Sequence, residues 1–380
     1  MTRVELVLLA SLGALAACET SGVSDASALP DADALDAARE DAGLDAGRPV
    51  VIASVEDLGL LPHPSDVVVG RDGASSGVVG GARLWTFGDT FVSHVTPWDG
   101  SNVVTATGAW SGVSLPIVLD QSVDADGVPP QLIPYTADEL AANQRDATNG
   151  WALWPGPVID TGTGEALVLF QRIKRTMGSG FDGVGVGTAR IAPRERVARR
   201  DPTDLFSRPL PPETGGDVLY GNGGVSVIGE TAYFLGCEGV GCRLARVPRA
   251  RADDRSAFEF YDGRAWVADI AMARPVLLAV NAASLSFNEH FGRFVMIASR
   301  LGSNDVLVRT APSIEGPWPT SSLVIEPAEG GILAAAEGND YLAHEQPGLG
   351  EPDGRSIVIS YSRPLGSFRG EIRLARLTFE

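Results

Sequence analysis

The 380-residue sequence is poor in lysine, cysteine and histidine. It contains one lysine, Lys174, among 30 basic residues, together with three cysteines and four histidines. Chemistry that needs a lysine nucleophile would therefore depend on Lys174, which lies between arginines at a polar strand end. The formal net charge is −18. This acidity argues against a nucleic-acid or anionic-membrane surface, because phosphate binding needs clustered Lys and Arg.

The N-terminus carries a short apolar run at residues 6–18, preceded by Arg3. The run is too short for a membrane-spanning helix, which needs about 20 apolar residues, and its small-residue ending is typical of a secretory signal. The ending Leu-Ala-Ala-Cys at 15–18 resembles a bacterial lipobox. We therefore expect residues 1–17 to be a cleaved signal and Cys18 to carry the lipid; the alternative is an ordinary signal peptide. The residue after Cys18 is Glu19 and not the aspartate that resembles an inner-membrane retention signal, which favours delivery to the outer membrane.

Residues 18–48 differ in composition from the rest of the chain. Residues 19–48 contain eight acidic and two basic residues, a net charge of −6, and no aromatic residue. Such a segment cannot bury enough apolar surface to offset its ordering entropy. We expect a disordered acidic tether over 18–48, followed by a single folded domain over 49–380. The overall hydrophobic share of 44% is enough for a sizeable core in that domain.

The other two cysteines lie close together in the motif Gly-Cys-Glu-Gly-Val-Gly-Cys. Cys237 and Cys242 flank a glycine-rich turn, and an exported protein meets an oxidising compartment. A disulfide is the preferred reading, with free thiols as the alternative. A metal site would need two further ligands, and the segment offers none.

Strand signals recur along the body and helix signals are scarce. Most of the β-rich runs are bounded by Gly, Pro, Asn or Asp, as strands and turns require. The best helical window is short, at 136–145. The sequence therefore predicts an all-β domain, with strands at 82–91, 103–110, 166–173, 183–191, 224–235, 243–247, 277–286, 293–299, 306–310, 356–362 and 371–379.

Five similar units recur about 65 residues apart. Each has a glycine turn followed by an apolar strand that ends in an aromatic or small polar residue, and the units begin near residues 80, 164, 229, 292 and 354. Five such units predict a five-bladed β-propeller. The alternative is a two-sheet sandwich, for which the body is long.

The densest polar signal lies at 63–91, where Asp66, Asp72 and Asp89 interrupt apolar and glycine-rich strand sequence. Aspartate is poor in strands. Acids at strand ends therefore form turns or line a cavity, and composition alone leaves both readings open for Asp72 and Asp89.

The stretch that contains Arg71-Asp72-Gly73 and Trp-Thr-Phe-Gly-Asp-Thr-Phe at 85–91 resembles the N-terminal signature of a bacterial family long described as a domain of unknown function. That family is now associated with endo-D-arabinanases, which are five-bladed propeller glycoside hydrolases. Weaker matches follow in order. They are Trp-Pro-Gly-Pro-Val at 154–158, Tyr-Gly-Asn-Gly-Gly at 220–224, Phe-Asn-Glu-His-Phe-Gly-Arg-Phe at 287–294 and Ser-Tyr-Ser-Arg at 360–363.

The resemblance implies that Asp72 and Asp89 are the acidic pair of a glycosidase acting on a furanoside polysaccharide such as D-arabinan. Glycoside hydrolysis needs two carboxyls, one to protonate the leaving oxygen and one to activate water or attack carbon. We prefer Asp72 as base and Asp89 as acid in an endo-acting, inverting enzyme, with the two roles exchangeable. The acid should be the more buried carboxyl, and the base the more solvated or cation-paired one.

Substrate contacts are expected from aromatic and amide side chains near strand ends. The candidates are Trp154, Asn222, Asn288, Tyr361 and Trp110, each of which has a packing or turn role as its alternative. His344 and Glu345 are further residues that could line the pocket. We expect no cofactor and no catalytic metal, with a structural Ca²⁺ on the propeller axis left open.

The competing function is a non-catalytic surface propeller that binds glycan or protein, because a fold alone does not determine function. The expected setting is the cell envelope. There the protein would be a lipid-anchored monomer facing an extracellular or periplasmic polysaccharide, with membrane contact through the N-terminal lipid only.

Overall fold

The computed structural model describes residues 50–96, 100–176, 180–209, 216–239, 241–300, 302–319, 323–325, 339–366 and 368–380. The expected signal peptide, Cys18 and the tether lie outside these residues. No helix in the described ranges is long and apolar enough to span a membrane.

Five antiparallel sheets form the body, and they follow one another along the chain as blades I to V. Blade I contains β2 (Val68–Arg71), β3 (Ala74–Val79), β4 (Ala82–Val92) and β5 (Val103–Ser111). Blade II contains β6 (Trp151–Asp160), β7 (Ala166–Thr176), β8 (Gly180–Ile191), β9 (Arg199–Arg200) and β10 (Phe206–Ser207). Blade III contains β11 (Gly224–Ile228), β12 (Thr231–Glu238), β13 (Gly241–Pro248), β14 (Glu259–Tyr261), β15 (Trp266–Val267) and β16 (Pro275–Leu278).

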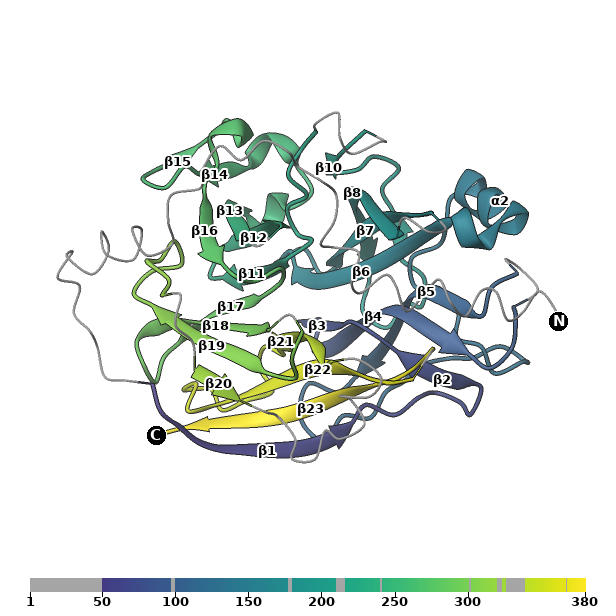
Figure 1. The fold of residues 1–380 in the computed structure, drawn as a ribbon, viewed down its shortest axis with the longest axis horizontal. Helices are drawn as coiled ribbons and strands as arrows, with labels where there is room; N and C mark the ends of the chain where they lie inside the picture. The colour runs from purple at the N-terminus through teal and green to yellow at the C-terminus, as the bar shows by residue number, and fades with distance from the viewer. Residues whose placement is uncertain are drawn as a thin grey trace.

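Blade IV contains β17 (Ser284–Asn288), β18 (Arg293–Ser299), β19 (Val306–Ala311) and β20 (Leu323–Ile325). Blade V contains β21 (Tyr341–Glu345), β22 (Ser356–Gly366) and β23 (Arg369–Phe379), and its outermost strand is β1 (Ile52–Leu60) from the start of the body. The two ends of the described chain therefore pair in one sheet, which closes the ring (Figure 1).

The inner strands of the five blades surround a common axis. Each of β3, β6, β11, β17 and β21 contacts the next in that order, and β21 contacts β3. Figure 1 shows these strands around the centre of the molecule, with helix α2 (Ala137–Arg145) at the rim. The five-bladed propeller predicted from the sequence is confirmed.

Apolar side chains pack between neighbouring blades rather than in one central core. Five clusters of buried residues lie at the five blade interfaces, and the cluster between blades I and V includes Trp85, Phe87 and Leu374. Both faces of each sheet are therefore covered. This explains why β4 is buried along almost its whole length and why β7 begins with five consecutive buried apolar residues.

Most predicted strands are present with ends moved by a few residues. Two predicted runs were wrong because each contains a turn: 224–235 divides into β11 and β12 at Gly229, and 277–286 divides into β16 and β17. The longer strands β1, β2, β3, β6 and β21 were not predicted, because glycine, proline, serine or acidic residues weaken their strand pattern. Helix α2 begins as predicted, with Thr136 as its N-cap in a capping box with Glu139.

Candidate active site

Two acidic residues of blade I lie side by side where its inner strand is interrupted. Asp72 lies between β2 and β3, both of which pair with β4, and Asp89 lies on β4. The backbone N–H of Asp72 donates to Asp89 O at 3.0 Å. In return the backbone N–H of Asp89 donates to Asp72 Oδ1 at 2.6 Å. The structure therefore brings together the two acids that the sequence singled out.

Two glycines shape this contact. Gly73 follows Asp72 with φ of 54°, a left-handed conformation that turns the chain from β2 into β3. Gly88 precedes Asp89, and a Cβ at that position would lie 2.7 Å from Asp72 Oδ1. The absence of a side chain at Gly88 thus leaves room for the Asp72 carboxylate against the β4 backbone.

Neighbouring blades complete the polar cluster. Trp154 on β6 donates its Nε1–H to Asp89 Oδ1 at 3.1 Å, which places this predicted substrate contact beside the acids. Tyr341, at the start of β21, donates its hydroxyl to Asp72 Oδ2 at 3.2 Å. Blades I, II and V therefore all contribute to the site. The beginnings of their inner strands gather there because the inner strands of a propeller run in one direction.

Burial and mutual charge alter the protonation of both acids. Burial is the main cause that raises the pKa of Asp72, to about 7, and the charge of Asp89 adds to it. Hydrogen bonds from the Asp89 backbone and Tyr341 act in the opposite direction. Burial also raises the pKa of Asp89, while the Arg175 cation and the Trp154 N–H oppose that increase. Burial therefore favours the protonated form of both carboxyls, and the like charge of the neighbour adds to this effect at Asp72.

The same electrostatics bear on the roles of the two acids. The cation beside the pair is Arg175, on β7, and it favours the charged form of Asp89. The charge of Asp89 instead favours the protonated form of Asp72. The two criteria for the roles differ here, because Asp89 is the less exposed of the two carboxyls while Arg175 favours its charged form. The roles of acid and base therefore stay a prediction, and either assignment fits the pair.

An aromatic pair extends from Asp89 toward solvent. The ring of Phe181 on β8 lies 5.3 Å from the ring of Trp154, tilted by 58°. Phe181 is 41% exposed, which is unusual for a large apolar side chain next to a polar cluster. Sequence reasoning missed Phe181, Arg175 and Tyr341, because each reaches the acids only through the packing of a neighbouring strand or blade.

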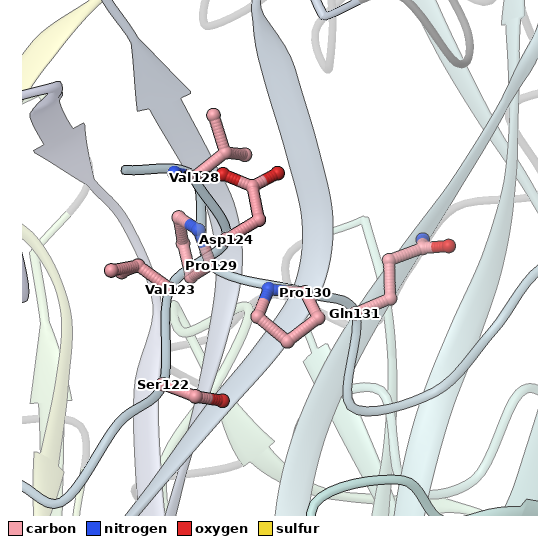
Figure 2. A pocket seen from close by; sticks show the side chains of 7 residues that line it. All are labelled: Ser122, Val123, Asp124, Val128, Pro129, Pro130 and Gln131. Atoms are coloured by element: carbon pink, nitrogen blue, oxygen red, sulfur yellow. Dashed lines mark hydrogen bonds between the residues drawn. The ribbon is translucent and has the colours of Figure 1, made fainter. Parts of the chain in front are cut away.

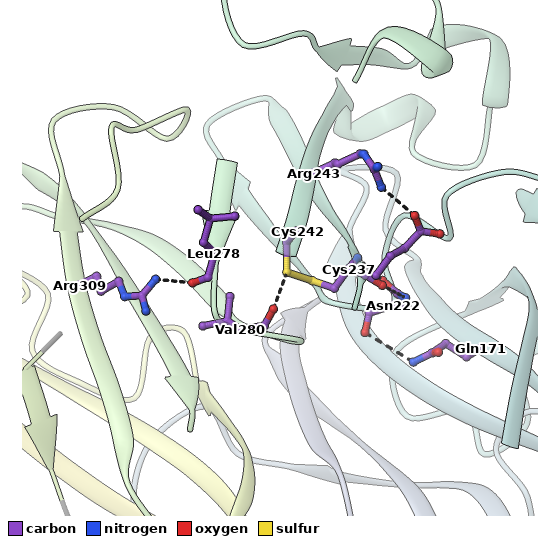
Figure 3. Close-up of a disulfide and its surroundings, with 9 residues drawn as sticks. Gln171, Asn222, Cys237, Cys242, Arg243, Leu278, Val280 and Arg309 are labelled. Atoms are coloured by element: carbon purple, nitrogen blue, oxygen red, sulfur yellow. Dashed lines mark hydrogen bonds and ion pairs between the residues drawn. A yellow bond between two sulfur atoms is a disulfide. The ribbon is translucent and has the colours of Figure 1, made fainter. Parts of the chain in front are cut away.

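Asn222 lies near the axis, but its side chain is already engaged. Its Nδ2 donates to Cys237 O at 2.9 Å, and its Oδ1 accepts from the Cys237 backbone N–H at 2.8 Å (Figure 3). Both halves of the amide thus hold the start of blade III against β12. These two bonds give Asn222 a structural role, and its contact with substrate stays a prediction.

Three other predicted contacts also prove to be structural, because all three side chains are buried at 3% exposure or less. Asn288 donates to Gly354 O and accepts from the Phe291 backbone N–H. Tyr361 packs in the cluster between blades IV and V. Trp110 packs between blades I and II and donates its Nε1–H to Glu195 O. These contacts are structural, although Trp110 also lines a small cavity with Asp120 and Arg196.

The predicted disulfide between Cys237 and Cys242 is confirmed (Figure 3). It joins facing positions of β12 and β13. A Cβ at Gly223 would lie 2.1 Å from Cys237 Sγ, so the glycine lets β11 approach the bridge closely. The disulfide therefore supports the same segment that Asn222 anchors.

His344 and Glu345 lie further along β21, three and four residues after Tyr341. Burial raises the pKa of Glu345, whose carboxylate accepts from Ser286 Oγ at 2.5 Å. Burial also lowers the pKa of His344 to about 4. At about 3.3 Å per residue, Glu345 lies roughly 13 Å along the strand from Tyr341, away from the acidic pair. Within the described residues, no group of three or more His, Cys, Asp and Glu could hold a metal ion.

A surface pocket in blade I offers little competing chemistry. It is lined by Ser122, Val123, Asp124, Val128, Pro129, Pro130 and Gln131 (Figure 2). Its one carboxylate, Asp124, accepts from the backbone N–H groups of Asp126 and Val128 and so stabilises the loop. Asp72 and Asp89 do not line this pocket, so the axial cluster remains the best candidate for a reactive site.

Comparison with known proteins agrees with this fold. One similar solved structure is a candidate hydrolase from Bacteroides ovatus, with a TM-score of 0.56 and 15% identity over 82% of this chain and 87% of that chain. Another is Zg3597, a family 117 glycoside hydrolase from Zobellia galactanivorans, with a TM-score of 0.50 and 11% identity over 86% of this chain and 90% of that chain. At such identities the likeness shows the fold alone. No curated protein matches the sequence.

One family model matches part of the chain. Residues 223–341 match the model described as Domain of unknown function (DUF4185), which confirms the sequence-based resemblance to a propeller family of that kind. The matched region begins at the start of blade III and ends at Tyr341. Asp72 and Asp89 lie outside it, so their assignment depends on the geometry of blade I.

Proposed function

We propose that this protein is a glycoside hydrolase that cleaves a furanoside polysaccharide, such as D-arabinan, with Asp72 and Asp89. The observation that carries the proposal is the contact between these two acids, in which the Asp89 backbone N–H donates to Asp72 Oδ1 at 2.6 Å. Two neighbouring carboxyls, one that gives a proton and one that accepts a proton, are what acid–base cleavage of a glycosidic bond requires.

In the proposed reaction, Asp72 protonates the glycosidic oxygen of the leaving sugar. Asp89, ionised beside Arg175, accepts a proton from a water molecule as that water attacks the anomeric carbon. The bond from carbon to the leaving oxygen breaks, a new carbon–oxygen bond forms, and one water is consumed for each bond cleaved. Attack from the opposite face inverts the anomeric configuration.

Trp154 and Phe181 supply the proposed sugar platform. The face of a furanose ring is apolar enough to pack on an aromatic side chain, and the exposed Phe181 ring lies 5.3 Å from Trp154. Trp154 in turn contacts Asp89. A polymer bound along blade II would therefore be aligned with the acidic pair, as an endo-acting enzyme requires.

The test is reducing-end release from a panel of arabinans and other polysaccharides by the purified body, residues 49–380. Asp72→Asn and Asp89→Asn should each reduce release by about 10³-fold or more, because each removes one of the two proton-transfer groups. Asp66→Asn is the matched control, since Asp66 is an exposed acid of the same blade. Proton NMR of the first product gives the anomeric outcome.

Two results would contradict the proposal. The first is no release from any polysaccharide, and the second is release that both asparagine variants retain. Glycan binding without release would favour the alternative of a non-catalytic surface propeller. The proposed location, a lipid anchor at Cys18 in the cell envelope, is tested separately. Labelled fatty acid should be incorporated into the full chain and not into Cys18→Ser.

A further inference from the structure

We infer that Tyr341 is a positioning residue that orients the Asp72 carboxyl for proton transfer. The inference rests on the proposed function of the acidic pair. Tyr341 comes from blade V, more than 260 residues away in the chain, and its hydroxyl donates to Asp72 Oδ2 at 3.2 Å. The other carboxyl oxygen, Oδ1, already accepts the Asp89 backbone N–H. Both oxygens of Asp72 are therefore held, and the carboxyl has one orientation.

Ser362 on β22 lies beside both residues. It is opposite Tyr341 in the pairing of β21 with β22, and its Oγ accepts the backbone N–H of Gly73 at 2.9 Å. Because Gly73 directly follows Asp72, this bond ties the Asp72 turn to β22 next to Tyr341.

The backbone on both sides is distorted to make this contact. Gly73, directly after Asp72, has φ of 54°, and Leu342, directly after Tyr341, has φ of 53°. Leucine rarely adopts this left-handed conformation, which is costly for a residue with a Cβ. The register between β21 and β22 also shifts between Tyr341 and His344. Such irregularities re-aim side chains next to active sites.

The hydroxyl acts as a donor and does not exchange its own proton with substrate. Burial and the charge of Asp72 raise the pKa of Tyr341 well above its usual value, so the phenol stays neutral. A neutral donor stabilises the ionised form of Asp72 and limits how far burial raises the pKa of that carboxyl. Tyr341 therefore orients the Asp72 carboxyl and also makes the proton on Asp72 easier to release.

The decisive variant is Tyr341→Phe, which removes one oxygen and keeps the ring. Asp72 should then bind its proton about tenfold more tightly, the effect of losing one hydrogen bond to a charged group. We expect the alkaline limb of the pH profile of kcat/KM to move upward. The value of kcat should fall about 10- to 100-fold, with KM changed less than about twofold.

The protonation of Asp72 can also be measured without activity, by titrating carbon-13-labelled aspartate carboxyls, with the Asp72 signal identified by its loss in Asp72→Asn. Ser362→Ala should give a smaller change in the same direction, because the Tyr341 hydroxyl remains. Tyr220→Phe is the control, since the Tyr220 hydroxyl is buried without a hydrogen-bond partner among the described residues and should leave Asp72 unchanged.

The two kinds of failure are distinguishable. If Tyr341→Phe titrates like the parent protein, the inference is overturned whatever the activity. If kcat falls at every pH while both limbs and the Asp72 titration stay in place, Tyr341 is only a structural tie between blades I and V, and the inference is again overturned. If the parent hydrolyses no glycan, the proposed function fails, and the titration still decides whether Tyr341 controls Asp72.

Discussion

The indole of Trp154 donates a hydrogen bond to Asp89 Oδ1 at 3.1 Å, across the interface between blades II and I. This bond leaves Asp89 Oδ2 without a hydrogen bond from the described residues, so one oxygen is held and the other can face a ligand. The relationship joins the proposed sugar platform to the proposed base.

Trp154→Phe should keep the ring and remove the donor. A lost hydrogen bond to a charged group costs about 1.5–3 kcal/mol, so kcat/KM should fall about 10- to 100-fold. Trp110→Phe is the contrast, because Trp110 donates to a backbone carbonyl inside the core. It should lower Tm and leave kcat/KM within about twofold. Equal effects of the two changes on kcat/KM would contradict the assignment.

The stability of the protein should reflect the raised pKa of Asp72. The folded state binds a proton at this site up to about pH 7, whereas the unfolded chain releases it near 4. The stability contribution of that proton is present at low pH and is lost as the pH rises from about 4 through 7. Asp72→Asn should therefore have a Tm close to the parent at pH 4 and a higher Tm at pH 8. A Tm difference that does not change with pH would contradict this.

Gly88→Ala should reduce activity without unfolding the protein. The new Cβ would lie 2.7 Å from Asp72 Oδ1, so the carboxylate must shift, and a displacement of about 1 Å costs about 100-fold in rate. Gly112→Ala is the matched control, since a Cβ there meets nothing within 4 Å. The measurements are kcat and thermal unfolding of both variants. Unchanged kcat in Gly88→Ala would indicate that the observed position of Asp72 is not required.

Glu139 joins helix α2 to blade II and should matter for stability. It is buried and accepts from Arg200 Nη1 at 2.6 Å and Arg172 Nε at 3.1 Å. Burial alone would raise its pKa, but the Arg200 and Thr136 hydrogen bonds and the two cations lower it to about 2. Its contribution is therefore present at neutral pH and is lost as the pH falls from about 4.5 to 2.

Glu139→Gln leaves Arg200 without a carboxylate and Arg172 with Asp204 alone, and it should destabilise the fold by about 3 kcal/mol, measured by urea unfolding at pH 7. The control is Asp138→Asn, one residue earlier in the same helical turn, where the side chain is exposed. It should change the free energy of unfolding by less than about 0.5 kcal/mol. Similar losses in both variants would show that the buried ion network is not the cause.

Reduction of the disulfide should weaken blade III. The bridge closes a loop with a sequence separation of five residues, for which chain entropy predicts about 2 kcal/mol. The double variant Cys237→Ser with Cys242→Ser should match the reduced protein in Tm, and reductant should not lower its Tm further. Insensitivity of the parent Tm to reductant would contradict the prediction.

Local patterns were enough to predict the all-β propeller, the helix start at Thr136 and the disulfide, because each depends on residues close together in sequence. Composition did not distinguish a turn role from a catalytic role for Asp72 and Asp89, and the family resemblance singled them out. The two acids belong to one blade, where β2, β3 and β4 pair directly, so short-range hairpin pairing brings them together.

The other residues beside the two acids come from neighbouring blades, so only the closed propeller brings them to the site. Trp154, Arg175 and Tyr341 reach the acids from blades II and V, and no sequence period relates their side chains to Asp72. Tertiary packing likewise placed Tyr361, Trp110 and Asn288 in the interior, because burial depends on which sheet faces which. The pKa shifts of the two acids also depend on the tertiary structure, since a pKa is set by burial and by charges that are neighbours only in three dimensions.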